Sequence, residues 1–258
     1  MSAVWPQIGA VALRSITRTA RQPASAIPPL LFPVSLMFVN AAGLDASTQL
    51  PGFPTESFLA FALAVPFIQG ALFSTMNAGT DLARDIQTGF LNRLALTSMR
   101  GSALLAGQLG GIVLLGLIQA VVYLLVGVAV GVNFESGALG VLVLLAFSAL
   151  VSLGFGALGS LIALRTGSGE AVQGAFPLLF VFLFISSFNA PRELMEVDWF
   201  RAVATANPVS YLIECVRSLI ISGWDGQALA LGFGVAAAIA LAAIALAAWA
   251  MQGRLTRT

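Results

Sequence analysis

Six long runs of apolar residues, separated by shorter polar segments, dominate the sequence. Each run has about 20 residues or more, and a helix of that length, rising 1.5 Å per residue, spans the roughly 30 Å hydrocarbon core of a bilayer. The runs lie at about 26–44, 57–80, 101–131, 138–164, 171–190 and 227–251. The pattern predicts an all-α membrane protein, with residues 1–258 forming a single transmembrane domain of six spanning helices.

The segment 3–22, before the first run, has an amphipathic pattern. Arg14, Arg18 and Arg21 fall at i, i+4 and i+7 on one helical face. Trp5 and Ile8 begin an apolar stripe on the other face. The pattern is typical of an interfacial helix whose arginines face anionic lipid head groups. The alternative, a positively charged flank of the first span, explains the arginines but not the apolar stripe.

The segment 191–226, between the fifth and sixth runs, contains a second amphipathic pattern. Asn207 and Pro208 suit the cap and the first turn of a helix. The apolar positions that follow have helical spacing: Val209, Leu212, Ile213, Val216, Leu219 and Ile220. Glu214 and Arg217 fall on the opposite face, close enough to pair. The segment is too short and too charged to span, so we expect a re-entrant or surface helix at the outer leaflet.

The segment 84–100, between the second and third runs, is longer and more patterned than a simple connection needs. We call it the island segment. Asp85 or Thr88 can cap a helix start here. The apolar face of that helix would consist of Phe90, Leu91, Leu94 and Ala95. A short surface helix with one apolar face has two natural partners, the membrane interface or a groove on a soluble protein.

Charge placement predicts the orientation in the membrane. Most arginines lie in segments on the same side as the N-terminus, and most acidic residues lie on the other side. Because positively charged loops remain in the cytoplasm, we expect both termini and the island segment to be cytoplasmic.

The composition excludes most hydrolytic and redox chemistry. The chain is 59% hydrophobic and 9% charged, and all 12 basic residues are arginine, with no lysine and no histidine. Without lysine there is no Walker A phosphate loop, and without histidine there is no Ser-His-Asp triad or histidine-ligated metal. One cysteine, Cys215, excludes an internal disulfide and a multi-cysteine metal site. We therefore expect no catalytic residue, cofactor or metal in this chain, and no nucleic-acid partner.

Two sets of positions are candidates for a substrate pathway. One aromatic helical face is formed by residues that recur every four positions in the fifth run: Phe176, Phe180, Phe184 and Phe188. This face either meets lipid or packed core, or lines a path for an apolar substrate. The second run contributes two neutral polar residues, Gln69 and Asn77.

One motif has a simpler explanation than its pattern suggests. Residues 154–159 match G-x-G-x-x-G, which in a strand-to-helix turn indicates dinucleotide binding. Here the motif lies inside a continuous apolar run. Close packing of helices through small residues is the better interpretation.

The island segment resembles the cytoplasmic loop of ABC-2 type transporter permeases. The resemblance rests on residues 85–94 (DIQTGFLNRL) together with Thr97 and Arg100. It is strongest to the drug- and antibiotic-exporting subunits of the daunorubicin-resistance type. Residues 207–211 (NPVSY), with Glu214 and Arg217, resemble a second stretch of that family. Asn92 and Ser98 depart from the family pattern, where an acidic residue and a proline are common.

The resemblance implies a role for the chain in a larger complex. The chain would be the bacterial inner-membrane permease of an exporter, working with two ATP-binding subunits that hold ATP and Mg²⁺. A second permease chain, identical or a sister, would complete the unit within membrane lipid. The island segment would be the coupling helix that docks on the ATPase through Arg84, Asp85, Gly89, Phe90, Leu91, Arg93, Leu94, Thr97 and Arg100. The cargo would be apolar or amphipathic, such as a drug, an antibiotic or a lipid.

Two other functions compete with this one. An ion-coupled secondary transporter usually has ionisable residues in the middle of its spans. The clear span centres here hold only neutral polar groups, which counts against proton coupling. An intramembrane enzyme is disfavoured by the absence of histidine, lysine and mid-span carboxylates.

Overall fold

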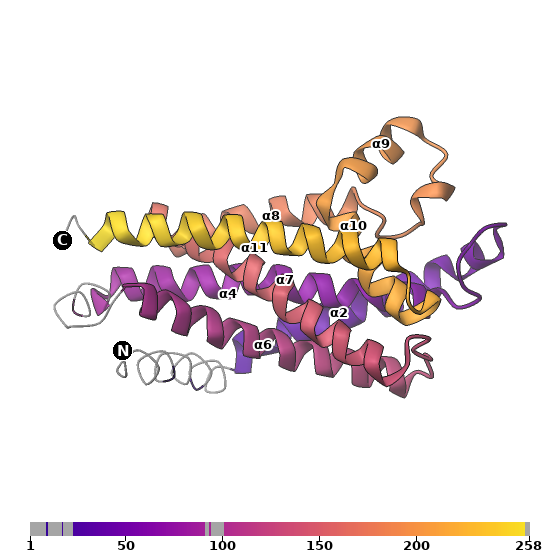
Figure 1. The fold of residues 1–258 in the computed structure, drawn as a ribbon, viewed down its shortest axis with the longest axis horizontal. Coiled ribbons are helices and arrows are strands. Elements are labelled where there is room, and N and C mark those ends of the chain that lie inside the picture. Colours follow the sequence, from indigo (N-terminus) through magenta and orange to yellow (C-terminus); the bar gives the residue numbers. More distant parts are fainter. Residues whose placement is uncertain (1–8, 10–16, 18–22, 91–92, 94–100, 256–258) are drawn as a thin grey trace.

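A computed structural model describes residues 9, 17, 23–90, 93 and 101–255, and all regular structure in these residues is helical. The long helices lie side by side along the long axis of the molecule (Figure 1). They are α2 (Pro23–Leu44), α4 (Ala64–Gln87), α6 (Gly101–Ala129), α7 (Gly137–Thr166), α8 (Gly169–Phe184) and α11 (Gly226–Leu255). The shorter elements are η1 (Asp45–Gln49), α3 (Phe58–Ala62), η2 (Arg192–Leu194), α9 (Asp198–Ala206), α10 (Pro208–Arg217) and η3 (Ser218–Ser222).

Among the described residues, five helical segments are long and apolar enough to cross a membrane. They correspond to the first four runs and the sixth run of the sequence. The fifth run forms α8, which has 16 residues and would rise only about 24 Å as a straight helix. The all-helical membrane fold is confirmed, whereas the count of six spans stays a prediction.

Helix α4 is the centre of the bundle. It contacts α7 most extensively, and also α2, α6, α8 and α10. The crossing with α7 is close, and it requires glycine at position 159. A Cβ atom at Gly159 would lie only 1.9 Å from the carbonyl oxygen of Thr75. Two other glycines of the 154–159 motif also face neighbouring helices, Gly154 against Ala240 and Gly156 against Ile112. The interpretation of this motif as helix packing is therefore confirmed.

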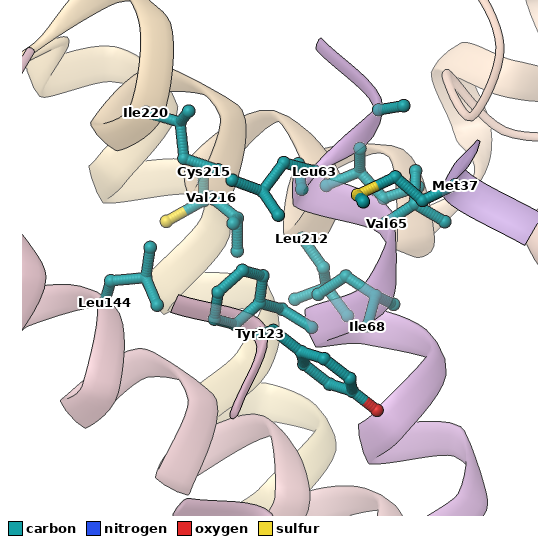
Figure 2. Close-up of a cluster of buried hydrophobic side chains, with 14 of the residues drawn as sticks. Met37, Leu63, Val65, Ile68, Tyr123, Leu144, Leu212, Cys215, Val216 and Ile220 are labelled. Atoms are coloured by element: carbon teal, nitrogen blue, oxygen red, sulfur yellow. The ribbon is translucent and has the colours of Figure 1, made fainter. Parts of the chain in front are cut away.

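A large buried cluster joins α2, α4, α6, α7 and α10 (Figure 2). Tyr123 of α6 lies within it, and its hydroxyl donates a hydrogen bond of 2.6 Å to the carbonyl oxygen of Pro29 in α2. That carbonyl would ordinarily accept from the N–H of residue 33, but Pro33 has none. The tyrosine thus satisfies a backbone acceptor that the proline leaves open.

The structure corrects the predicted end of the second span. Helix α4 continues through Arg84 and Asp85 to Gln87, so these residues form its last turn instead of a separate helix start. Thr88 ends α4: both its N–H and its hydroxyl bond to the carbonyl oxygen of Arg84. The prediction that Asp85 or Thr88 caps a new helix is wrong. The predicted interfacial helix 3–22 lies outside the described residues, apart from residues 9 and 17.

Candidate coupling and substrate sites

The island segment begins with a sharp bend. Gly89 has φ +68°, in the left-handed region that favours glycine, and a Cβ there would meet no atom within 4 Å. Phe90 and Arg93 follow in helical conformation, with the Arg93 N–H bonded to the Gly89 carbonyl oxygen at 3.1 Å. A new helical turn therefore starts directly after the bend. The other predicted docking residues lie outside the described part of the chain: Leu91, Leu94, Thr97 and Arg100.

The turn between α7 and α8 lies beside the end of α4. The Gln87 side-chain amide donates to the carbonyl oxygen of Gly167 at 3.2 Å. The Arg254 guanidinium of α11 donates to the carbonyl oxygen of Leu164 at 2.7 Å. The Ser168 hydroxyl caps α8 by accepting from the N–H of Ala171. The ends of four helices are thus tied together next to the bend at Gly89.

The predicted row of rings is continuous in space, although only Phe176, Phe180 and Phe184 belong to α8, and Phe188 lies in the non-helical segment after it. The ring centroids lie 5.0 Å apart for Phe176 and Phe180, 6.3 Å for Phe180 and Phe184, and 5.5 Å for Phe184 and Phe188. Phe73 of α4 lies 5.1 Å from Phe176, and Phe32 of α2 lies 6.1 Å from Phe180. Phe188 is buried and Phe184 is 52% exposed, so the row is partly open at the surface of the chain.

Gln69 and Asn77 lie one turn before and one turn after Phe73 on α4, so all three share a helical face. Asn77 is half-buried. Gln69 is fully buried, and neither of its amide atoms has a hydrogen-bond partner among the described residues. Leaving a buried amide without partners costs about 1–3 kcal/mol. This cost makes Gln69 an unusual residue to place in a helix that serves packing alone.

One prediction for the end of the bundle that carries α10 is wrong. Glu214 does not pair with Arg217; its carboxylate binds the guanidinium of Arg192 at 2.6 Å. Burial acts to lower the pKa of Arg192, but Glu214 and Tyr211 outweigh it, and the pKa is raised overall. The Arg192 guanidinium also lies 4.8 Å from the centre of the Tyr211 ring.

Arg217 faces the protein interior instead of the polar face predicted for it. Its guanidinium donates to the carbonyl oxygens of Phe61, Ser187 and Phe188 at 3.3, 3.0 and 3.3 Å. It also stacks on the Phe61 ring, 3.4 Å from the ring centre. Burial lowers its pKa to about 9, partly opposed by Glu214, so the group remains cationic at neutral pH. Arg217 thus joins α10 to the end of α3 and to the segment after α8.

The predicted start of α10 is confirmed. The Asn207 side chain accepts from the N–H of Val209, and Pro208 occupies the first helical turn. The Asn207 amide also donates to the carbonyl oxygen of Ile185, while Ser187 donates two hydrogen bonds to Ser210, one from its N–H and one from its hydroxyl. These bonds fix the position at which the aromatic helix α8 ends.

Sequence reasoning missed several residues of these sites. Phe73 and Phe32 belong to the aromatic row, and Arg192 is the partner of Glu214. The spacing of Phe73 from Gln69 and Asn77 was an available signal. No spacing rule connects Arg192 to Glu214, because the two residues are brought together only by the fold.

Comparisons with known proteins show the family of the chain. The sequence model described as ABC-2 type transporter matches residues 6–221. A daunorubicin resistance ABC transporter permease protein, DrrB1, from Streptomyces coeruleorubidus is 32% identical over 72% of this chain and 67% of its own length. The putative transport permease ycf38 of Cyanophora paradoxa is 26% identical, over 80% and 71% respectively. A probable doxorubicin resistance ABC transporter permease protein, DrrC, of Mycobacterium tuberculosis (strain CDC 1551 / Oshkosh) is 22% identical, over 81% and 75%.

The apolar helices and the helical bundle define a multi-pass membrane protein. The chain belongs to the ABC-2 type transporter family. Members of this family are the permease subunits of ABC transporters, which implies an ATP-binding partner subunit and agrees with a chain that is not itself an enzyme.

Proposed function

We propose that this chain is the transmembrane subunit of an exporter that moves apolar or amphipathic compounds out of a bacterial cell. The relatives named for daunorubicin and doxorubicin resistance support this class of cargo. The energy comes from two separate subunits that bind ATP and Mg²⁺, because a chain without lysine has no Walker A loop. Two permease chains, identical or sisters, form the path.

The continuity of α4 is the main support for this proposal. This helix runs without interruption from Gln69 and Phe73 to Gln87, where the bend at Gly89 begins the island segment. The distance from Phe73 to Gln87 is about 20 Å along a rigid helix. A displacement of the island segment by a closing ATPase therefore reaches the aromatic row through one element. The bond from Gln87 to Gly167 carries the same displacement to the start of α8.

The aromatic row is the proposed contact surface for the cargo. Phe184 is 52% exposed on a single chain, so a second permease chain facing α8 would enclose the row. Asn77, which is half-buried, would supply hydrogen bonds to the polar groups of an amphipathic compound, and the fully buried Gln69 would do so once the helices around α4 separate. In the proposed orientation both termini and the island segment are cytoplasmic and α10 is at the outer leaflet, with α8 completing six spans.

The aromatic row can be tested with a matched control on the same helix. Changing Phe180 and Phe184 together to Ala should lower the export of apolar compounds about thirtyfold, since two aromatic contacts of about 1 kcal/mol each sum to about 2 kcal/mol. Phe182, which is 48% exposed and has no ring partner in the row, is the control, and Phe182→Ala should leave export unchanged. Equal export by all variants would remove the row from the substrate path.

The proposed function itself is tested by co-purification. The chain is expressed with the ATP-binding subunit of its transporter, and the membrane complex is purified and assayed for ATP hydrolysis and for export into inverted vesicles. We expect a stable complex whose export requires ATP. Export that persists without ATP and follows an imposed ion gradient would instead identify a secondary transporter.

A further inference from the structure

A pocket at the α10 end has no part in the function proposed above. It has a volume of about 290 Å³ and lies between α10, the start of α11, Phe61 of α3 and the segment around η2. Drug-sized ligands occupy pockets of roughly 300–1,000 Å³. This pocket is at the lower limit of that range, so it suits a small group better than a whole drug molecule.

The wall of the pocket carries charges of both signs. Glu214 pairs with Arg192, and Arg217 lines the same pocket, so these three side chains carry a net charge of +1. Glu193 and Asp225 add two negative charges to the wall. The five side chains together carry a net charge of −1, so the wall disfavours an anion, whereas a zwitterion can meet both an arginine and a carboxylate. The pocket is therefore complementary to a zwitterion.

One donor on the wall has no partner. The Nε atom of Arg192 is buried and makes no hydrogen bond with any described residue, although the other end of the guanidinium binds Glu214. A buried donor without a partner is costly, and a charged one more so. Protein atoms enclose this Nε atom, so an anionic oxygen in the pocket would instead meet the accessible part of the Arg192 side chain, which is 19% exposed.

The depth of the pocket is indicated by two tryptophans. Trp224 precedes α11 and is 52% exposed, and Trp249 lies near the other end of α11 and is 62% exposed. From Gly226, where α11 begins, to Trp249 the helix rises about 34 Å. Tryptophan is enriched at both membrane interfaces, which lie about 30 Å or slightly more apart. Asp225, on the pocket wall, is therefore at the depth of the lipid head groups.

The pocket also borders a lipid-facing surface. Its lining includes Ala228 and Leu231 of α11, and Leu231 is 42% exposed. Only 22% of the apolar window of α11 is buried within the chain. An acyl chain can therefore lie along α11 while the attached head group occupies the pocket.

We propose that this pocket binds the head group of a zwitterionic phospholipid of the phosphatidylethanolamine class. The phosphate meets the accessible part of the Arg192 guanidinium, and the ammonium group meets Glu193 and Asp225. The bound lipid holds η2, α10 and the start of α11 together. In the orientation proposed above this is a lipid of the outer leaflet, but its binding does not depend on export.

Native mass spectrometry tests this site on the full-length chain in complex with its ATP-binding subunit. The complex is delipidated in detergent and titrated with dioleoyl-phosphatidylethanolamine or with dioleoyl-phosphatidylglycerol, which lacks the ammonium group. We expect the ethanolamine lipid to bind several-fold more tightly. The double variant Glu193→Gln with Asp225→Asn should reduce that preference to near unity, and asparagine retains the capacity of Asp225 to cap α11. Glu196→Gln, an exposed change on the same segment outside the pocket lining, should retain the preference.

Two results would overturn the lipid site. One is equal binding of both lipids that none of the variants changes, which indicates non-specific adsorption. The other is tighter binding of phosphatidylglycerol, which indicates a purely basic site. A complex that binds an amine-bearing transported compound in place of the lipid, with the same dependence on Glu193 and Asp225, would reassign the pocket to the cargo. Because complex formation and export are measured on the same preparation, loss of the lipid site is distinguishable from failure of the proposed function.

Discussion

Helices α4 and α11 are both long and apolar, but their surroundings are opposite. The apolar window of α4 is 94% buried within the chain, and that of α11 is 22% buried. Of the two, α11 has the higher mean hydropathy. In a membrane, lipid is as apolar as leucine, so hydrophobicity does not draw a helix to the centre of a bundle. The less apolar helix is the one inside.

The residues of the two helices account for the difference. Helix α4 approaches its neighbours closely: a Cβ atom at Gly70 would be 2.9 Å from Tyr123, and one at Gly79 would be 2.5 Å from Val172. Helix α11 meets α7 along one stripe of small buried residues, Ala236, Ala240, Ala243 and Ala247. Its other faces are exposed, as at Leu241 and Trp249. Small residues determine which surfaces pack, and large apolar ones face lipid.

The strongest test of this comparison is to place a large side chain at a packed glycine and at an open one. Gly159→Leu should prevent folding or cost about 3 kcal/mol or more, since the new side chain would run into the backbone of α4 at Thr75. Gly234→Leu on α11 should be tolerated, because a Cβ there meets no atom within 4 Å. Thermal melting in detergent, followed by size-exclusion chromatography, measures both. Equal melting temperatures would refute the central position of α4.

A smaller effect is expected from deletion of matched leucine side chains. Leu72→Ala removes a fully buried side chain of α4 and should cost about 2–5 kcal/mol through the cavity that it leaves. Leu241→Ala, at a position that is 70% exposed on α11, should change stability by less than about 0.5 kcal/mol. Reversible unfolding in mixed detergent micelles gives both values. A large cost at Leu241 would mean that another chain covers this face of α11.

The smallest change in stability is expected at Gln69. Gln69→Leu replaces an amide without partners by an apolar group of similar size, so stability should be unchanged or rise by about 1 kcal/mol. Export of amphipathic compounds should nevertheless fall, if the amide contributes to the path. Ser74→Ala on the same helix is the control, since the Ser74 hydroxyl bonds only to the backbone of its own helix at Gly70. A variant at Gln69 that is destabilised with normal export would assign the amide to structure.

The sequence predicts which segments form helices better than it predicts which helices pack against one another. Five long apolar segments were found where the runs lie, because length and hydropathy are local properties. The burial of α4 was not predicted, since it depends on which helices cross at Gly159 and Gly79. Arg217 shows the same limit: its position three residues after Glu214 suggested an ion pair, but its acceptors come from residues 61, 187 and 188.

The same limit applies to the candidate sites, where a repeat within one helix is predictable from the sequence and contacts between helices are not. The aromatic face of α8 follows from a four-residue repeat and was predicted. Its partners on α2 and α4 follow from tertiary packing and were not. At the island segment, the hydrophobic pattern predicted a helix, but the position of its start depends on Gly89, whose φ of +68° ends one helix before the next begins.

Cargo-stimulated ATP hydrolysis by the reconstituted complex measures coupling through the island segment. The double variant Arg93→Glu with Leu94→Ser changes the island segment without touching the packed part of α4. Arg201→Glu, on the exposed helix α9, is the matched charge reversal. We predict that the island variant folds and inserts but loses both stimulated hydrolysis and export, while the α9 variant retains both. Stimulated hydrolysis and export at the wild-type level in the island variant would show that the island segment does not couple the ATPase to the permease.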